Sequence, residues 1–233
     1  VSIDKTKKFQ KIILRRSLKE PVAYILKKKE FWSKNFIVNK NVLIPRPETE
    51  LMVEKIVNIF EEKDIFILDI GTGTGCILLS ILSELKYARG LGVDISSRAI
   101  EIAKKNLQKL KLPNKIKFDV KSLNEIYGYK FDLIVSNPPY VLEEEKPQIH
   151  PNVLEYEPHL ALFSSTEDPI QFYRAVIQFA ALHLSPGGRL YFELNPNSAK
   201  AVISLLKTMN FVDIVVENDM KNQARMLVAK TKK

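Results

Sequence analysis

Cysteine is nearly absent from this chain of 233 residues, because Cys76 is the only one. No disulfide can form within the chain, and we expect Cys76 to pack in the core of a cytoplasmic protein, where thiols stay reduced. Histidine is scarce too: His150, His159 and His183 have neither the spacing of metal ligands nor a neighbouring cysteine, so we expect no metal site. The serine motif G-x-S-x-G is also missing, which argues against a hydrolase of that type.

Long hydrophobic runs are absent as well. No apolar run is long enough to span a bilayer, and the polar, lysine-rich start differs from a signal peptide. Hydrophobic residues nevertheless make up 45% of the chain, which is enough for the core of one large domain. The sequence therefore predicts a globular protein without a membrane segment, and we expect a monomer.

Acidic residues are few in the first 40 positions. This segment holds twelve Lys and Arg against three acids, whereas the remainder holds 24 of each sign, so the net charge of +9 lies entirely in the N-terminal segment. Two interpretations stay open. In the first, the segment contacts nucleic acid or an acidic protein surface. In the second, it is a solvated helix face whose apolar residues Phe9, Ile12 and Ile13 turn inward, or whose basic face covers a domain absent from this chain.

The first 60 residues predict small elements. Residues 5–18 form an amphipathic pattern typical of one helix. Residues 30–44 predict a β-hairpin, with residues 36–38 and 42–44 as its arms and residues 39–41 as its turn. Pro47 is suited to the first turn of a helix whose apolar stripe extends to Phe60.

From Ile65 onward, strand and helix patterns alternate, which predicts a mostly parallel sheet. We expect strands near residues 66–70, 91–94, 116–120, 132–136, 189–194, 211–216 and 225–230. We expect helices near residues 76–86, 97–110, 169–184 and 197–208. A turn over residues 185–188 precedes the fifth strand. Only the polar stretch 217–222 joins the last two strands, so we expect a hairpin there and an antiparallel last strand.

A glycine-rich loop follows the first strand of this alternating region and precedes a helix. It consists of Gly71, Thr72, Gly73, Thr74 and Gly75. Its spacing differs from the G-x-G-x-x-G of dinucleotide sites. Asp94 ends the next strand, where a carboxylate can accept hydrogen bonds from a ribose diol or cap the helix that starts near Ser97. The pattern indicates a nucleoside cofactor with little phosphate binding, and S-adenosylmethionine (SAM) fits it better than NAD.

A second loop follows the apolar run at residues 131–135. It consists of Asn137, Pro138, Pro139 and Tyr140, and the two prolines stiffen it. An amide and an aromatic ring at fixed spacing suit a planar, neutral nitrogen nucleophile. Because the carboxyl ends of parallel strands share one edge, we expect both loops and Asp94 on one rim. The long segment 141–165 is expected to form the substrate mouth.

These segments, in this order, resemble class I SAM-dependent methyltransferases that act on nitrogen. Residues 20–25, 30–32, 43–50, 157–162 and 186–188 are further similar to the HemK-like protein-(glutamine-N5) methyltransferases. The resemblance implies a Rossmann-like sheet, SAM as cofactor, and methylation of the GGQ glutamine of peptide-chain release factors. Such enzymes usually carry a helical domain ahead of the catalytic one. We therefore expect a piece of a longer polypeptide, with residues 1–44 as the remnant of that domain plus a hairpin linker and residues 45–233 as the catalytic domain.

The expected roles of the site residues follow from this resemblance and from the chemistry of an amide acceptor. The Asn137 side-chain carbonyl and the Pro138 backbone carbonyl would each accept one hydrogen from the substrate NH2, and Tyr140 would pack against the amide. Pro139, Arg46 and Glu193 complete the expected substrate site, although Arg46 could instead pair with Glu48 and Glu193 could be a structural acid. The cofactor site is expected to comprise Gly71, Thr72, Gly73, Thr74, Gly75, Asp94, Asn137 and, near the adenine, Ser122 and Leu123.

Two other functions remain possible at this point. An N6-adenine methyltransferase on DNA or RNA would use the same loop on a flipped base, and the basic segment supports it. No target-recognition domain is evident, however. A non-enzymatic SAM-binding scaffold is the second alternative, and the intact loop at residues 137–140 argues against it.

Overall fold

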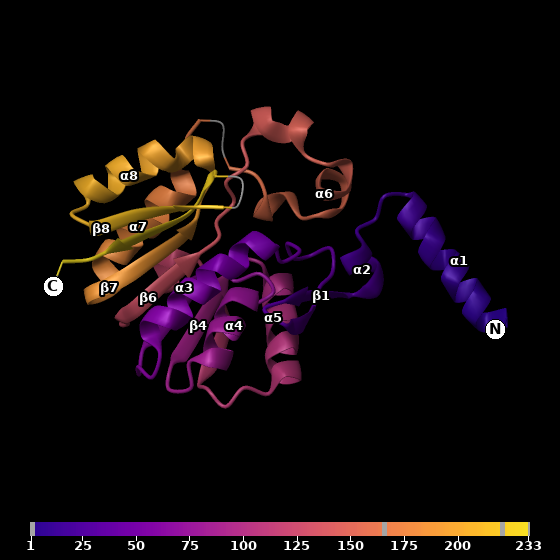
Figure 1. Ribbon diagram of the computed structural model, residues 1–233, viewed down its shortest axis with the longest axis horizontal. Coiled ribbons are helices and arrows are strands. Elements are labelled where there is room, and N and C mark those ends of the chain that lie inside the picture. The colour runs from indigo at the N-terminus through magenta and orange to yellow at the C-terminus, as the bar shows by residue number, and fades with distance from the viewer. Residues whose placement is uncertain (1–2, 165–166, 220–221, 233) are drawn as a thin grey trace.

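The computed structural model describes residues 3–164, 167–219 and 222–232. At its centre lies a seven-stranded sheet with the order β5-β4-β3-β6-β7-β9-β8 (Figure 1). The strands are β3 (Phe66–Ile70), β4 (Arg89–Asp94), β5 (Ile116–Val120), β6 (Phe131–Ser136), β7 (Leu184–Glu193), β8 (Val212–Asn218) and β9 (Ala224–Lys230). Pairs from β5 to β7 run parallel, whereas β9 is antiparallel to both β7 and β8. The predicted sheet and its reversed last strand are confirmed.

Helices cover both faces of this sheet. The α-helices are α1 (Ile3–Ser17), α2 (Val22–Leu26), α3 (Glu50–Phe60), α4 (Cys76–Glu84), α5 (Ser97–Leu110), α6 (Pro151–Tyr156), α7 (Gln171–His183) and α8 (Ala199–Thr208). Short 3-10 turns are η1 (Pro47–Thr49), η2 (Leu123–Glu125), η3 (Glu143–Gln148), η4 (His159–Ala161) and η5 (Pro196–Ser198). The four helices expected after residue 65 are therefore present, as is the helix introduced by Pro47.

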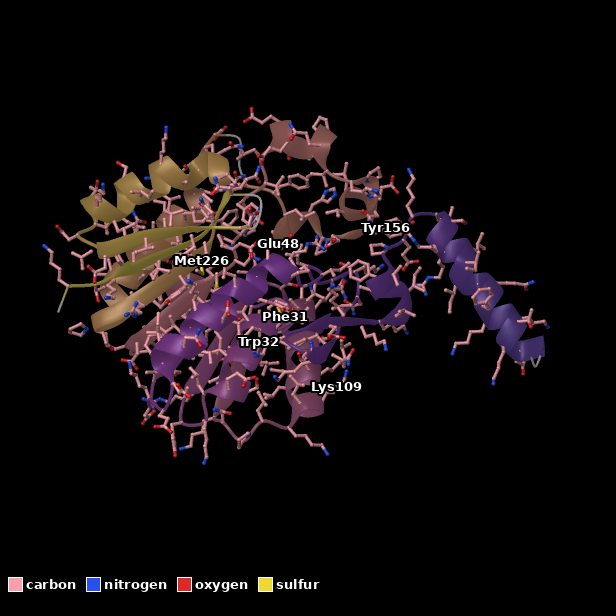
Figure 2. All side chains as sticks on the ribbon, in the orientation of Figure 1. Phe31, Trp32, Glu48, Lys109, Tyr156 and Met226 are labelled. Atoms are coloured by element: carbon pink, nitrogen blue, oxygen red, sulfur yellow. The ribbon has the colours of Figure 1, made fainter. Side chains whose placement is uncertain are left out.

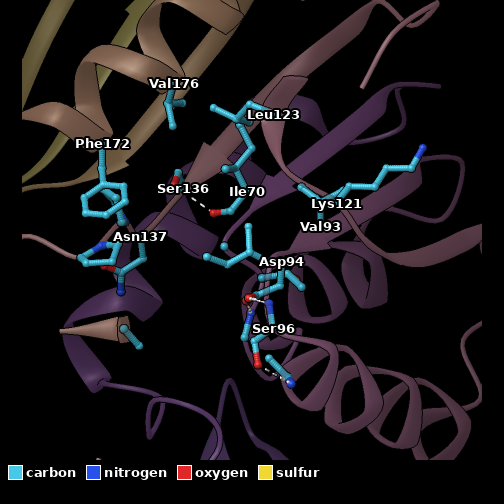
Figure 3. Close-up of a pocket in the computed structure, with 18 of the residues that line it drawn as sticks. Ile70, Val93, Asp94, Ser96, Lys121, Leu123, Ser136, Asn137, Phe172 and Val176 are labelled. Carbon is cyan, nitrogen blue, oxygen red and sulfur yellow. Dashed lines mark hydrogen bonds between the residues drawn. The ribbon is translucent and has the colours of Figure 1, made fainter. Parts of the chain in front are cut away.

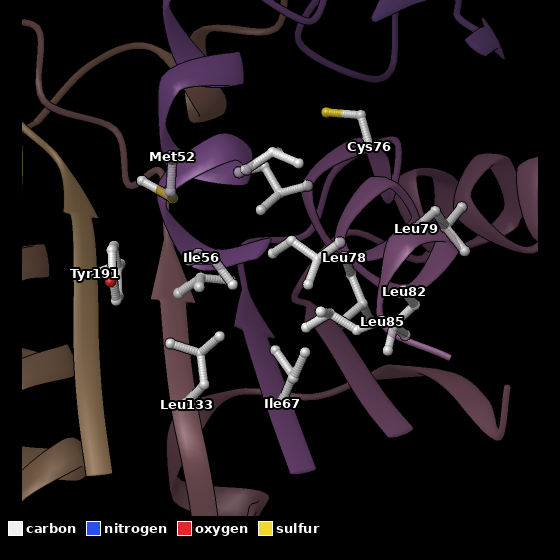
Figure 4. Close-up of a cluster of buried hydrophobic side chains, with 14 of the residues drawn as sticks. Met52, Ile56, Ile67, Cys76, Leu78, Leu79, Leu82, Leu85, Leu133 and Tyr191 are labelled. Carbon is white, nitrogen blue, oxygen red and sulfur yellow. The ribbon is translucent and has the colours of Figure 1, made fainter. Parts of the chain in front are cut away.

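Alternating side chains of each strand supply two separate cores, because successive residues of a strand face opposite sides of a sheet. Ile67 joins a cluster with residues of α3, α4 and α5, including Met52 and Leu78 (Figure 4). Its neighbour Leu68 joins a second cluster with residues of α7 and α8, including Val176. Cys76 is buried in the first cluster, as expected, and burial raises the pKa of its thiol to about 12.

The N-terminal hairpin lies earlier in the chain than predicted. Its strands are β1 (Lys28–Phe31) and β2 (Lys34–Ile37), and the turn is Trp32-Ser33. Both turn residues have positive φ, 50° and 53°, as a type I′ hairpin turn requires, but neither is the usual Asn or Gly. The expected arm at residues 42–44 is not a strand; Val42 and Ile44 are instead buried in a small cluster with Tyr24.

One other loop departs from the sequence prediction, and a second agrees with it. The expected turn at residues 185–188 lies within β7 as a bulge, since Phe131 pairs with Leu184 and Leu133 already pairs with Arg189. Gly187 has a φ of +73° there, which glycine tolerates. The stretch that joins β8 and β9 is short, as predicted, although residues 220–221 of it lie outside the described residues, as does residue 165 of the predicted mouth segment.

Helix α1 projects from the body of the molecule (Figure 1). The predicted inward face is not buried: Phe9 is 61% and Ile13 is 50% exposed, and nothing in the described chain covers them. The Tyr156 hydroxyl donates to the Leu18 carbonyl, and Figure 2 shows Tyr156 on the side of the body nearest α1. None of the helices in the described ranges is long and apolar enough to cross a bilayer. The boundary expected at residue 44 stays a prediction.

Candidate active site

A cavity of about 790 Å³ opens at the carboxyl ends of β3, β4 and β6. This volume lies within the range of roughly 300–1,000 Å³ that is usual for small-molecule sites. Figure 3 shows Asn137 and Phe172 on one side of it, Asp94 and Ser96 on the other, and Ile70 between them. The sequence prediction that both loops and Asp94 meet on one rim is therefore correct.

The glycine-rich loop turns sharply between β3 and α4. Gly71, Gly73 and Gly75 have φ values of +70°, +53° and +77°, which residues with a Cβ rarely adopt. The amides of Gly71 and Thr72 both donate to the Val93 carbonyl, at 2.9 and 3.0 Å. The loop is thus tied to β4, and its upper surface at Gly71 is open, since a Cβ there would meet nothing within 4 Å.

Asp94 braces this loop from the end of β4. Its Oδ2 accepts from the Gly73 amide at 3.0 Å, and its Oδ1 accepts from the Ser96 amide at 2.9 Å. Burial raises the pKa of Asp94, while these amide bonds oppose that shift. Ser96, not Asp94, caps α5, because its side chain accepts from the Ala99 amide. The helix-cap alternative for Asp94 is therefore wrong, and its carboxylate lines the cavity.

A second acid, Asp69, lies beneath the loop and was missed in the sequence. It is 1% exposed, and its Oδ2 accepts from the Thr72 hydroxyl at 2.6 Å. Burial raises the pKa of Asp69 to about 7. The available signal was an acid inside the otherwise apolar run at residues 66–70.

The wall of the cavity formed by η2 and α7 is mainly apolar. Ser122 and Leu123 line it as expected, although the Ser122 hydroxyl is engaged with Glu125 at 2.8 Å. Helix α7 contributes Phe172 and Val176, which the sequence interpretation did not single out. Their spacing of four residues places them on one helix face, and this was the signal that could have identified them.

The second loop is anchored by a buried acid. Glu193, at the end of β7, is 3% exposed. Its Oε2 accepts from Asn137 Nδ2 at 2.9 Å and from the Thr49 hydroxyl, and its Oε1 accepts from the Tyr140 hydroxyl at 2.7 Å. Three donors from two distant segments thus converge on one carboxylate. Thr49 was not expected at the site.

The electrostatics around Glu193 reflect this burial. Burial raises the pKa of Glu193, while the hydrogen bonds from Thr49 and Tyr140 and the charge of Arg225 oppose the rise. Burial, and then the nearby Glu193 charge, holds the pKa of Tyr140 well above its ordinary value. Tyr140 is therefore a hydrogen-bond donor, and a donor favours an ionised acceptor beside it.

The prediction for Glu193 left two roles open, and the geometry favours the structural acid. Asn137, Pro138 and Pro139 line the cavity. Tyr140 turns its hydroxyl to Glu193, and its ring packs against the second core cluster. Contact of Tyr140 with a substrate stays a prediction.

Arg46 forms a different ion pair from the one considered in the sequence. It lines the cavity and contacts Glu157 at 2.6 Å rather than Glu48. The Glu157 side chain is 1% exposed, and its other oxygen accepts from the Ile44 amide at 3.0 Å. This pair joins the segment before α3 to Glu157, the residue that follows α6. Within the described ranges, no group of three or more His, Cys, Asp or Glu is arranged to hold a metal.

Known proteins resemble this chain in sequence and in fold. A family model described as "Methyltransferase small domain" matches residues 47–157. The chain is 41% identical over 225 residues to a release factor glutamine methyltransferase of Flavobacterium psychrophilum. The alignment covers 94% of this chain and 78% of that protein. It is 42% identical over 231 residues to a protein of the same name from Bacteroides thetaiotaomicron, and that alignment covers 98% of this chain and 82% of that protein.

A solved structure of a methyltransferase from Pyrococcus furiosus matches the fold with a TM-score of 0.62, covering 96% of this chain and 98% of that one. At 14% identity this likeness concerns the fold alone, and it confirms the predicted class I methyltransferase architecture. The two relatives confirm the predicted family. The chain therefore belongs to the release factor glutamine methyltransferases.

Proposed function

We propose that this chain transfers a methyl group from SAM to the side-chain amide nitrogen (N5) of the glutamine in the GGQ motif of peptide-chain release factors. The observation that carries the proposal is the meeting of Asn137 with the glycine-rich loop and Asp94 around one cavity. The names of the relatives point to the same acceptor.

The residues of the cavity fit SAM. The open surface at Gly71 leaves room for the methionine part, and Asp94 retains acceptor capacity for a ribose diol because each carboxylate oxygen can accept two hydrogen bonds. The apolar wall that includes Leu123 and Val176 suits a flat base. When bound, SAM supplies an electrophilic methyl group on a sulfonium.

The asparagine loop provides what an amide acceptor needs. Asn137 Nδ2 is held by Glu193, which leaves Oδ1 as the end of the carboxamide available to a ligand. Asn137 Oδ1 and the Pro138 carbonyl each accept one hydrogen of the substrate NH2 and orient its nitrogen. Orientation of this kind lowers barriers by about 7–11 kcal/mol in the best intramolecular cases. Arg46 and Pro139, on the cavity wall, position the glutamine-bearing loop.

The test is mass spectrometry of a GGQ-bearing release factor incubated with the protein and SAM. We expect a mass increase of one methylene unit, located on the GGQ glutamine. A release factor with that glutamine replaced by alanine is the matched control, and it should gain no mass.

DNA and tRNA are offered in parallel, with tritiated SAM. Label on adenine and none on the release factor would overturn the proposal in favour of the nucleic-acid alternative. Tight SAM binding without transfer to any acceptor would favour a non-enzymatic binding protein.

A further inference from the structure

We propose that Thr49 is a positioning residue for methyl transfer, because its hydroxyl fixes the Glu193 carboxylate that orients the Asn137 carboxamide. Thr49 ends η1, directly before α3, and it is 4% exposed. It also lines the cavity. The inference rests on the proposed function for the role of Asn137, but the hydrogen-bonded geometry stands independently of it.

Three hydrogen-bond donors hold the Glu193 carboxylate. The Thr49 hydroxyl donates to the same Glu193 oxygen, Oε2, that receives Asn137 Nδ2. The other oxygen, Oε1, is held by the Tyr140 hydroxyl. Each of the three donors stabilises the buried carboxylate, because unsatisfied lone pairs in a dry environment are costly. Thr49 therefore determines how Glu193 is rotated.

The rotation of Glu193 decides which end of the carboxamide a substrate meets. An ionised carboxylate can only accept hydrogen bonds, so Asn137 must present Nδ2 to it and keep Oδ1 on the opposite side. A substrate NH2 can donate to Oδ1 but would be repelled by an NH2 group. If Glu193 loses the Thr49 donor, its charged form is less stabilised, and a protonated acid can instead donate to Oδ1. The carboxamide would then turn its donor end to the substrate.

Valine at position 49 tests this, since it replaces the hydroxyl by a methyl group of similar size. We expect Thr49→Val to lower kcat for methylation about 10-fold or more, since small misplacements at a reacting centre are costly. KM for the release factor and the SAM dissociation constant should stay unchanged within error. Thr49→Ser keeps the hydroxyl and should recover most of the rate.

Thr231→Val is the matched control. The Thr231 hydroxyl donates to the Ser185 carbonyl at 2.8 Å near the end of β9, and it does not line the cavity. It should keep the wild-type kcat. If Thr49→Val does not fold, Thr49→Ala takes its place, because the smaller side chain cannot overpack the site.

The outcomes separate the inference from the proposed function. Failure of the wild-type protein on the release factor overturns the proposed acceptor, and the variants are then compared on the acceptor that wild type does methylate. Crystal structures of wild type and Thr49→Val give a readout without any acceptor, in which we expect Glu193 and Asn137 to rotate together. Wild-type kcat in Thr49→Val, an equal loss in Thr49→Ser, or unmoved Glu193 and Asn137 would each overturn the positioning role.

Discussion

On one side of the cavity, between β3 and β4, the site is built from backbone: Gly71 and Thr72 donate to Val93, and Asp94 holds the Gly73 amide. We call residues 71–75 and Asp94 the glycine-loop side. On the other side, at the ends of β6 and β7, the site is built from side chains that meet on Glu193. We call Thr49, Asn137, Tyr140 and Glu193 the asparagine side.

The two sides differ in how far apart their contacting residues lie in the sequence, and in the step of the reaction that each serves. Gly73 and Asp94 are 21 residues apart, whereas Thr49 and Glu193 are 144 apart. A backbone cradle suits a cofactor that is the same in every cycle. A side-chain network suits the reacting atom, where one carboxamide must keep a single orientation. Changes on the asparagine side should therefore affect turnover, and changes on the glycine-loop side should affect SAM binding.

The largest effect is expected from Asn137→Ala. Loss of the carboxamide removes the acceptor that orients the substrate nitrogen, and loss of one such preorganised group typically lowers kcat about 10²–10³-fold. Steady-state kinetics and calorimetric SAM titration measure the two effects separately. Asn114→Ala is the matched control, because its amide donates to the Leu85, Lys86 and Ala88 carbonyls and does not line the cavity, so it should keep kcat. Normal turnover in Asn137→Ala would contradict the assigned role.

The next effect concerns the shape of the glycine loop. In Gly75→Ala the alanine would have to adopt a φ of +77°, and its Cβ would lie 2.9 Å from the Phe118 ring. We expect a loss of about 2–3 kcal/mol in unfolding free energy, from backbone strain plus overpacking, together with weaker SAM binding.

Gly128→Ala is the matched control for Gly75→Ala. Gly128 has a φ of +76° but open space around its Cβ position. It should lose only the strain contribution, about 1 kcal/mol, and keep its SAM affinity. Urea unfolding of both variants checks this, and equal losses would show that Phe118 does not restrict the loop.

A smaller effect is expected from Asp94→Asn. The Gly73 and Ser96 amides donate to different oxygens of Asp94, and asparagine would present an NH2 group to one of them. SAM should therefore bind about 10-fold more weakly, with a smaller change in kcat at saturating SAM. Asp132→Asn is the control: Asp132 also accepts a distant backbone amide, from Phe66, but lies away from the cavity lining. A larger loss of kcat than of SAM affinity in Asp94→Asn would contradict the assignment of SAM binding to the glycine-loop side and turnover to the asparagine side.

The smallest effect is the pH dependence of stability due to Asp69. Its pKa of about 7 lies above the value of about 3.9 in an unfolded chain. The folded state therefore binds the proton more tightly, so this contribution is complete below about pH 4 and is lost as the pH rises through 7. In Asp69→Asn the fall in unfolding free energy between pH 6 and 7 should shrink by about 1 kcal/mol. An unchanged fall in urea unfolding would contradict it.

Local patterns made the glycine-loop side predictable. An apolar run that ends in closely spaced glycines implies a strand, a tight turn and a helix, and Asp94 follows at the end of the next strand. The same logic located residues 137–140 at the end of β6 and the hairpin of β8 and β9. These features depend only on residues that are neighbours in the sequence, so a single sequence is enough to predict them.

Other features depend on long-range contacts that one sequence does not display. Thr49 and Glu193 could not be paired from their positions, and Arg46 was compared with nearby Glu48 when its partner is Glu157. The hairpin was misplaced because Trp32 and Ser33 adopt turn angles that usually select Asn or Gly. The inward face expected for α1 assumed a partner that the described chain does not provide. A role for the basic segment in contacting nucleic acid, an acidic protein surface or a missing domain stays a prediction.

The most direct test of the division between the two sides is a crystal structure of the protein with S-adenosylhomocysteine. The account predicts the nucleoside against Asp94 and Leu123, with the sulfur directed toward Asn137 while Nδ2 remains on Glu193. A sulfur remote from Asn137, or a carboxamide with its oxygen turned to Glu193, would contradict it.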